Sequence, residues 1–155
     1  MKAEYINPFL NAAKNVIETM ANLSVKNEKP SLKQGNLSWG VISGLVGMAS
    51  EKLKGHMVIS FDLPCILGIV SNMLSEQYTE ITEDVIDAVG ELTNMICGGA
   101  KKELSEMGYV FDLAMPLMIT GKDVEITQFG KGPVISIPFV TEKGRFVVEA
   151  NLTER

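Results

Sequence analysis

The sequence contains few of the residues from which metal, redox or nucleic-acid sites are built. It has one histidine, His56, and two cysteines, Cys65 and Cys97, whose separation fits neither a CxxC motif nor a zinc site. Both cysteines stand among apolar residues, so we expect two buried, reduced thiols rather than a disulfide. Lys101 and Lys102 form the only adjacent basic pair in a chain of net charge −5, which argues against a nucleic-acid partner.

Long apolar runs are also missing. The longest weakly apolar segment, 40–49, contains three glycines and has about half the length that a membrane span requires. The N-terminal residues include no apolar stretch of signal-peptide length. Phosphate-loop and nucleophile-elbow motifs are absent from the sequence as well. We therefore expect a cytoplasmic protein with no membrane span.

Hydrophobic periodicity and turn residues predict three helices and several strands. The first helix is expected at about 8–21, with Asn7 as its N-cap and Pro8 in its first turn. The second is expected at 65–76, and the third runs from a cap at Thr82 or Asp84 to about Met107, before Gly108. The predicted strands are 37–48, 56–63, 109–120, 124–129, 133–140 and 145–152.

The two halves of the chain repeat one order of features. The sequences 40–43 and 133–136 each contain Val-Ile-Ser and begin a predicted hairpin, and the second arms run from Lys to Leu at 54–63 and 143–152. We predict one α+β domain over residues 1–155, with a duplicated helix-plus-hairpin unit at about 4–63 and 83–152 and a linking helix at about 65–76. Its strands would form one antiparallel sheet, with the long helices packed on one face.

The third predicted helix carries the candidate site. At about 100° per residue, its apolar residues fall on one face; they are Val85, Val89, Leu92 and Ile96. Asp87, Glu91 and Asn94 fall together on the opposite face, and Gly98 and Lys101 continue that row. Two carboxylates and an amide are thus presented on a helix that is held from behind by packing. Taken alone, such a row is more typical of an ordinary solvated helix face than of a functional site.

The pattern Asp87-x3-Glu91-x2-Asn94-x3-Gly98 resembles the signature of the CheC/CheX/FliY family of bacterial chemotaxis phosphatases. The chain length, the order of helices and strands and the doubled half-unit resemble that family over essentially the whole chain. The resemblance is specific because both the motif and the duplicated half-unit are features of that family.

The first copy of the repeat departs from the pattern. Asn11, Asn15 and Glu18 stand where the second copy has its acid, acid and amide. The resemblance is therefore to the single-site CheX type. It implies one working site per chain and a homodimer.

The resemblance implies that the chain removes phosphate from the aspartyl phosphate of a CheY-type response regulator. Asn94 would orient the attacking water, and Glu91 would pair with a lysine of the regulator. Asp87, Gly98 and Lys101 would contact the partner. The regulator would supply Mg²⁺, so we expect no cofactor and no metal site in this chain, whose acidic pair lacks the Glu-x-x-His partner of helical metal sites.

Two other functions remain open at this point. The chain could be a non-catalytic docking module for a receiver domain or a flagellar switch component, or a dimerisation domain with no receiver partner. Gly98 and the adjacent Gly99 also have two interpretations. They would either let the backbone of a partner come close or relieve crowding against another element of this chain.

Overall fold

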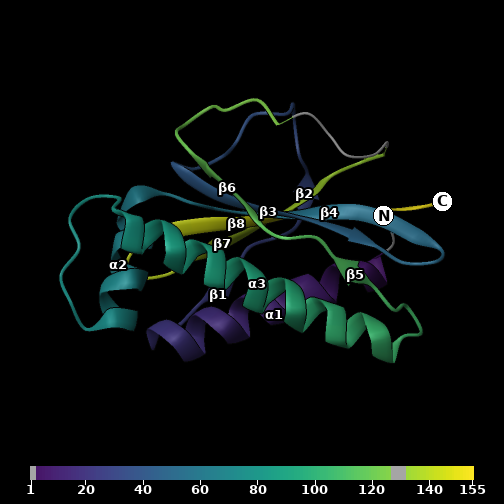
Figure 1. Cartoon of the computed structure of the whole chain (residues 1–155), viewed down its shortest axis with the longest axis horizontal. Coiled ribbons are helices and arrows are strands. Elements are labelled where there is room, and N and C mark those ends of the chain that lie inside the picture. Colours follow the sequence, from purple (N-terminus) through teal and green to yellow (C-terminus); the bar gives the residue numbers. More distant parts are fainter. Residues whose placement is uncertain (1–2, 127–131) are drawn as a thin grey trace.

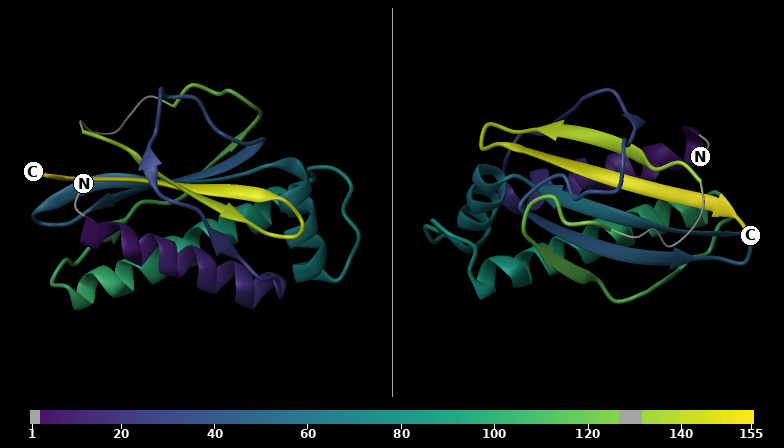
Figure 2. Two further views of the ribbon diagram at one scale, coloured as in Figure 1. Left: turned by 180° about the vertical axis from the view of Figure 1, so that it is seen from behind. Right: turned by 90° about the horizontal axis from the view of Figure 1, so that it is seen from above.

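Two layers make up the fold, which is described by a computed structural model over residues 3–126 and 132–155. The helices α1 and α3 lie side by side on one face of an antiparallel sheet, and α2 packs near one end of them (Figures 1 and 2). The helices are α1 (Ala3–Ala21), α2 (Leu63–Leu74) and α3 (Glu83–Glu106); the strands are β1 (Lys26–Asn27), β2 (Ser31–Leu32), β3 (Ile42–Ala49), β4 (Leu53–Phe61), β5 (Asp112–Leu113), β6 (Leu117–Thr120), β7 (Ile135–Val140) and β8 (Arg145–Glu154). This confirms the predicted α+β class with the long helices on one face.

Two hairpins form the middle of the sheet. The strand order is β1-β7-β8-β4-β3-β5, with β2 also paired to β7 and β6 to β3, and all pairs are antiparallel. The β3–β4 and β7–β8 hairpins meet along β4 and β8. In the first hairpin Ser43 pairs with Ser60. When the two halves of the sequence are aligned, Ser43 matches Ser136 and Ser60 matches Glu149, and these two residues also pair in the second hairpin. This agreement of register supports the duplication, which remains a proposal.

The core lies between the helices and the sheet. Side chains alternate across each strand, so Ile42, Val46 and Met48 of β3 face the helices and are buried. On the same face the ring of Phe146 stacks on Phe139, with centroids 4.7 Å apart. Burial of these apolar side chains contributes most of the stabilisation, and it fixes α1 and α3 to the sheet.

The first helix is one turn longer than predicted. It begins at Ala3, so Asn7 lies inside the helix and is not its N-cap, and Pro8 is an interior residue. Tyr5 explains the extension, because its ring packs edge-on against Tyr109 at 5.4 Å and the two hydroxyl groups are 3.1 Å apart. A long-range contact thus outweighs the local preference of proline for a first turn.

Several strand limits also differ from the prediction. The first hairpin strand begins at Ile42 because Gly40 packs against the backbone of Phe61, where a Cβ would overlap the carbonyl oxygen. Asp62 caps α2 by accepting from the backbone N–H of Cys65 at 2.9 Å, so α2 begins earlier than predicted and the preceding strand ends at Phe61. The predicted strand 109–120 is split into β5 and β6.

Two further segments differ. The predicted strand 124–129 contributes only the bridge between Leu37 and Glu125, and its residues 127–129 lie outside the described part. Residues 31–32, which lie outside every predicted helix and strand, form the short strand β2, which pairs with β7.

The residues singled out for redox or metal chemistry are buried. Cys65 and Cys97 are free and buried, and burial raises the pKa of both thiols to about 12. His56, the first residue of the predicted strand 56–63, lies inside β4 opposite Asn151 and is 1% exposed. Burial lowers its pKa. Among the described residues, no helix has both the length and the apolarity needed to cross a membrane.

Candidate functional site

The helix that carries the site, α3, has well-defined ends. Thr82 is its N-cap and accepts from the backbone N–H of Val85 at 3.4 Å. The exposed acids Glu83 and Asp84 occupy the first turn, where negative charge is favourable toward the helix dipole. Gly108 follows the last turn with a φ of 95°, a conformation that suits glycine. These limits confirm the predicted third helix.

The predicted row of polar residues faces away from the core. Asp87, Glu91 and Asn94 are exposed, whereas Gly98 and Lys101 are partly exposed. On the opposite face the four apolar residues of the predicted stripe are 0% exposed; they are Val85, Val89, Leu92 and Ile96. A rigidly packed helix therefore presents the two acids and the amide in one line.

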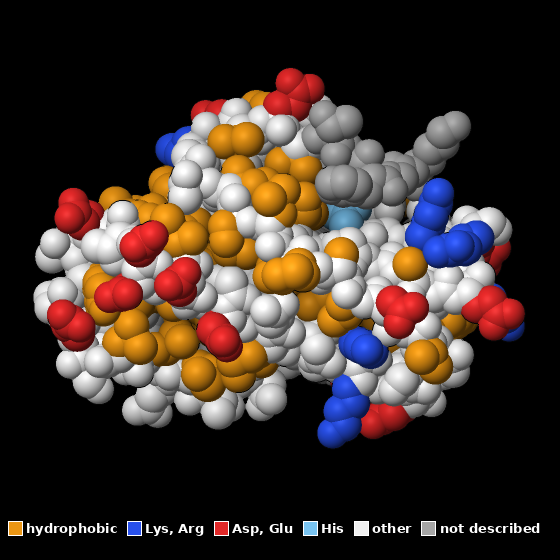
Figure 3. All heavy atoms as spheres, viewed as in Figure 1, with side chains coloured by type: hydrophobic (Ala, Val, Ile, Leu, Met, Phe, Trp, Pro, Cys, Tyr) orange, Lys and Arg blue, Asp and Glu red, His pale blue; other side chains and the backbone are white. Residues whose placement is uncertain are grey.

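The side chains of this row are available to a partner. The side chains of Asp87, Glu91 and Asn94 form no hydrogen bond or ion pair with another side chain or backbone group in the described ranges. Acidic side chains gather on the molecular face around the N-terminal half of α3, and lysines lie toward its C-terminal half (Figure 3). Asn94 lies between Asp87 and Glu91 on one side and a mixed group of lysines and acids on the other, Lys101, Lys102, Glu103 and Glu106.

The two adjacent glycines of α3 have different surroundings. A Cβ at Gly98 would meet no atom within 4 Å, so this position faces open space. A Cβ at Gly99 would lie 3.1 Å from the Cβ of Ala12 in α1, which is close for two carbon atoms. Crowding within the chain therefore accounts for Gly99 but not for Gly98.

The corresponding face of α1 is occupied by contacts within the chain. Glu18, at the position that overlays Asn94, accepts from the backbone N–H of Val25 at 3.0 Å. Asn11 donates to the carboxylate of Glu103 on α3, with distances of 3.2 and 3.4 Å to the two oxygens. These residues stabilise the fold locally, so only α3 presents the full row.

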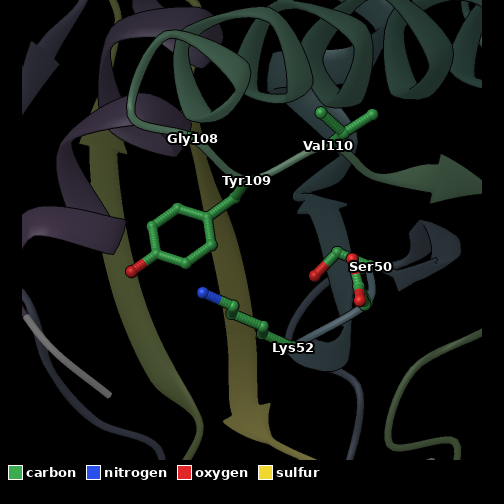
Figure 4. Close-up of a pocket in the computed structure, with 6 residues that line it drawn as sticks. Ser50, Lys52, Gly108, Tyr109 and Val110 are labelled. Carbon is green, nitrogen blue, oxygen red and sulfur yellow. The ribbon is translucent and has the colours of Figure 1, made fainter.

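Two cavities among the described residues lie near α3 but are not lined by the two acids and the amide of the row. One of about 110 Å³ is found beyond the C-terminal end of α3, where Lys52 extends toward the ring of Tyr109 (Figure 4). Another, of about 320 Å³, lies in the groove between α1 and α3 and is lined by Asn15 and Glu106 among others. Asp87, Glu91 and Asn94 line neither of them. An exposed convex face of this kind fits a macromolecular substrate better than a small molecule.

Two residues next to the row were not predicted from the sequence. Thr93 is fully buried on α3 and packs against Gly44 of β3. A hydroxyl residue on an otherwise apolar stripe was the signal that could have drawn attention to Thr93. For Gly44 the sequence offered no such signal, since glycine is also common in turns.

The chain is similar to known proteins of bacterial chemotaxis. The family model described as chemotaxis phosphatase CheX matches residues 42–140. A crystal structure of a CheC-like superfamily protein from Shewanella sp. PV-4 is 44% identical, with a TM-score of 0.91 and coverage of 99% of both chains. The CheY-P phosphatase CheX of Thermotoga maritima is 26% identical over 132 residues, which are 84% of each chain.

A complex is also among the similar structures. CheX of Borrelia burgdorferi, solved together with CheY, BeF₃ and Mg²⁺, is 28% identical, with a TM-score of 0.78 and coverage of 99% of both chains. The matched family model spans more than half of this chain and includes the whole of α3. The chain therefore belongs to the CheX family of chemotaxis phosphatases.

Proposed function

We propose that this protein hydrolyses the aspartyl phosphate of a CheY-type response regulator. The observation that carries the proposal is the exposed pair Glu91 and Asn94 on a helix fixed from behind, in a chain of the CheX family. The Thermotoga maritima relative is a CheY-P phosphatase, and the Borrelia burgdorferi relative forms a complex with CheY. Because the proposed substrate is a signalling protein of the cytoplasm, the reaction would take place there.

Asn94 would supply the part of the chemistry that the regulator lacks. Phosphoryl transfer requires mainly positioning and charge compensation, and an aspartyl phosphate is already an activated group. The Asn94 carboxamide can accept a hydrogen bond from a water molecule while its N–H₂ donates to a phosphoryl oxygen. A carboxylate at this position would repel the phosphate. The neutral amide therefore suits a residue that places water in line with the departing aspartate oxygen.

Glu91 would anchor the helix to the partner. It lies three residues before Asn94, on the same face, and its carboxylate is exposed. In a site shielded from water by the partner, its attraction to a lysine ammonium would be stronger than at an open surface. We assign Asp87 and Lys101 to the edges of the same contact, and Gly98 to a point where the backbone of the regulator comes close.

We propose that Mg²⁺ arrives with the regulator. Among the described residues, no group of three or more acidic, histidine or cysteine side chains is placed to hold a metal ion. Bound Mg²⁺ would neutralise charge on the phosphoryl oxygens, while this chain contributes the amide and the acid.

The test is the rate of phosphate release from a phosphorylated regulator with and without this protein. Asn94→Ala should abolish the acceleration and leave the unfolding temperature unchanged, since the side chain is exposed. Asn15→Ala on α1 is the matched control, an exposed asparagine outside the proposed site, and should retain full activity. Wild-type turnover by Asn94→Ala would refute the assignment. Binding without acceleration by the wild type would instead indicate a docking module.

We also propose that the chain forms a homodimer through the edge of the sheet at β6. Two exposed apolar residues support this surface, Met115 at 89% and Leu117 at 57% exposure. An open strand edge with apolar side chains readily pairs with a second copy. Light scattering should give twice the chain mass for the wild type, and Leu117→Lys should reduce it to one chain. A monomeric wild type at micromolar concentration would contradict the proposal.

A further inference from the structure

The helical turn between Glu91 and Asn94 contains a buried hydroxyl group. Thr93 is 0% exposed and lies on a helix face whose other buried residues are apolar. Its Oγ1 donates to the backbone carbonyl of Val89 at 2.6 Å. A side-chain bond to the carbonyl four residues earlier competes with the backbone hydrogen bond and commonly bends a helix. The bond therefore acts on the turn that carries both proposed site residues.

The sheet has a matching space beneath this hydroxyl. A Cβ at Gly44 of β3 would overlap Thr93 Oγ1 and lie 3.0 Å from both Thr93 Cβ and Thr93 Cγ2. The other positions of β3 that face the helices carry large side chains, Ile42, Val46 and Met48. Only at Gly44 does the strand omit a side chain on this face, and there it receives the threonine.

A second contact fixes the same turn from the side. Met118 of β6 pairs with Gly44 in the sheet, and its Sδ lies 3.7 Å from the position of a Cβ at Gly90. A glycine of the strand thus receives a helix side chain, while a glycine of the helix receives a strand side chain. In Figure 1 α3 lies below the sheet that contains β3 and β6, and it contacts both strands. The arrangement limits both rotation and sliding of α3 at Asn94.

We propose that Thr93 is a positioning residue for Asn94. Its bond to Val89 fixes the orientation of the Thr93 side chain in this turn, and its contact with Gly44 holds the turn against the sheet. Together they determine where the Asn94 amide places the attacking water. A displacement of about 1 Å can cost about 100-fold in rate when geometry is the main contribution to catalysis. This inference depends on the proposed role of Asn94.

The first experiment compares Thr93→Val, which keeps the shape and removes the hydroxyl, with Thr93→Ser, which keeps the hydroxyl. We expect Thr93→Val to lower kcat for phosphate release by about tenfold and to leave KM within about twofold, because the contacts with the partner are unchanged. Thr93→Ser should retain roughly half of the wild-type kcat or more. Wild-type kcat in Thr93→Val, or equal losses in both variants, would overturn the proposal.

A second pair of variants separates positioning from packing. Thr93→Ala should lower both the unfolding temperature and kcat, because it leaves a cavity. Adding Gly44→Ala fills that space from the strand once the two Cβ atoms, 3.0 Å apart without relaxation, have moved apart by a few tenths of an ångström, so the double variant should regain part of the lost unfolding temperature while kcat stays low. Recovery of kcat together with stability would show that Thr93 acts through packing alone, and this would also overturn the proposal.

The proposed role of Asn94 is tested separately, by the turnover of Asn94→Ala. If Asn94→Ala retains turnover, the proposed function fails whatever Thr93 does. If Asn94→Ala is inactive while Thr93→Val has wild-type kcat, only the positioning role is lost.

Discussion

The substitution Gly98→Ala should separate protein stability from partner binding. Alanine is favoured over glycine inside a helix by about 1 kcal/mol, and a Cβ at Gly98 meets nothing within 4 Å. We therefore expect the free energy of unfolding to increase by about 0.5–1 kcal/mol. Urea unfolding followed by circular dichroism measures this gain.

The same methyl group should impair catalysis if the backbone of the regulator lies against Gly98. Inserting a methyl group into a closely packed contact costs about 1–3 kcal/mol. This corresponds to an increase in KM of about 5-fold to more than 100-fold when KM reflects binding. Steady-state phosphate release at increasing regulator concentration gives KM, and kcat should change less.

Gly99→Ala is the matched control, since it adds the same atom one residue further along. Its Cβ would lie 3.1 Å from that of Ala12, so the gain in helix propensity is offset by crowding against α1. We expect stability within about 0.5 kcal/mol of the wild type and unchanged KM. A destabilised Gly98→Ala would refute the inference of open space around Gly98. A stable variant with wild-type KM would remove Gly98 from the partner surface.

Three further predictions concern charges outside the proposed site. Lys33→Met removes the ion partner that lies 2.5 Å from the buried carboxylate of Glu149, and it should lower the free energy of unfolding in urea at pH 7 by about 3 kcal/mol. A decrease below about 1 kcal/mol would refute the stabilising role of the pair. Burial raises the pKa of Glu149 above its ordinary value of 4.5, although Lys33 opposes the shift. The folded wild type should therefore lose stability relative to Glu149→Gln as the pH rises from 4.5 through the pKa of Glu149 in the folded protein. Parallel curves of stability against pH for the two proteins would contradict this. Glu18→Ala removes the acceptor for Val25 N–H and should cost about 1 kcal/mol, with phosphate release unchanged; lost turnover would instead place α1 in the active surface.

The helix that carries the proposed site was predictable because its signals are local. The apolar stripe of α3 is long, Thr82 caps one end and Gly108 ends the other, so periodicity alone placed Glu91 and Asn94 on one exposed face. The start of α1 was not predictable in this way. Its first turn depends on Tyr5 meeting Tyr109, a residue more than a hundred positions away.

Burial on the face of the sheet opposite the helices could not be foreseen either. Lys33 and Glu149 look like surface charges in the sequence, yet their side chains are only 11% and 4% exposed. His56 begins the predicted strand 56–63, and nothing in the sequence indicated that it would be 1% exposed within β4. Similarly, Gly98 and Gly99 are equivalent in sequence, and only the position of α1 distinguishes them. Which residues are covered depends on the path of distant segments.

The placement of β8 has a consequence for how the protein reaches its native state. This strand follows α3 in the chain, yet it occupies the middle of the sheet between β7 and β4. Until β8 emerges from the ribosome, the β3–β4 hairpin has no neighbouring strand along β4, and the sheet on which the helices pack is incomplete. Pairing β4 with β8 closes a loop of many residues, which slows folding. During biosynthesis the catalytic surface would therefore assemble late, after the residues that compose it have been made.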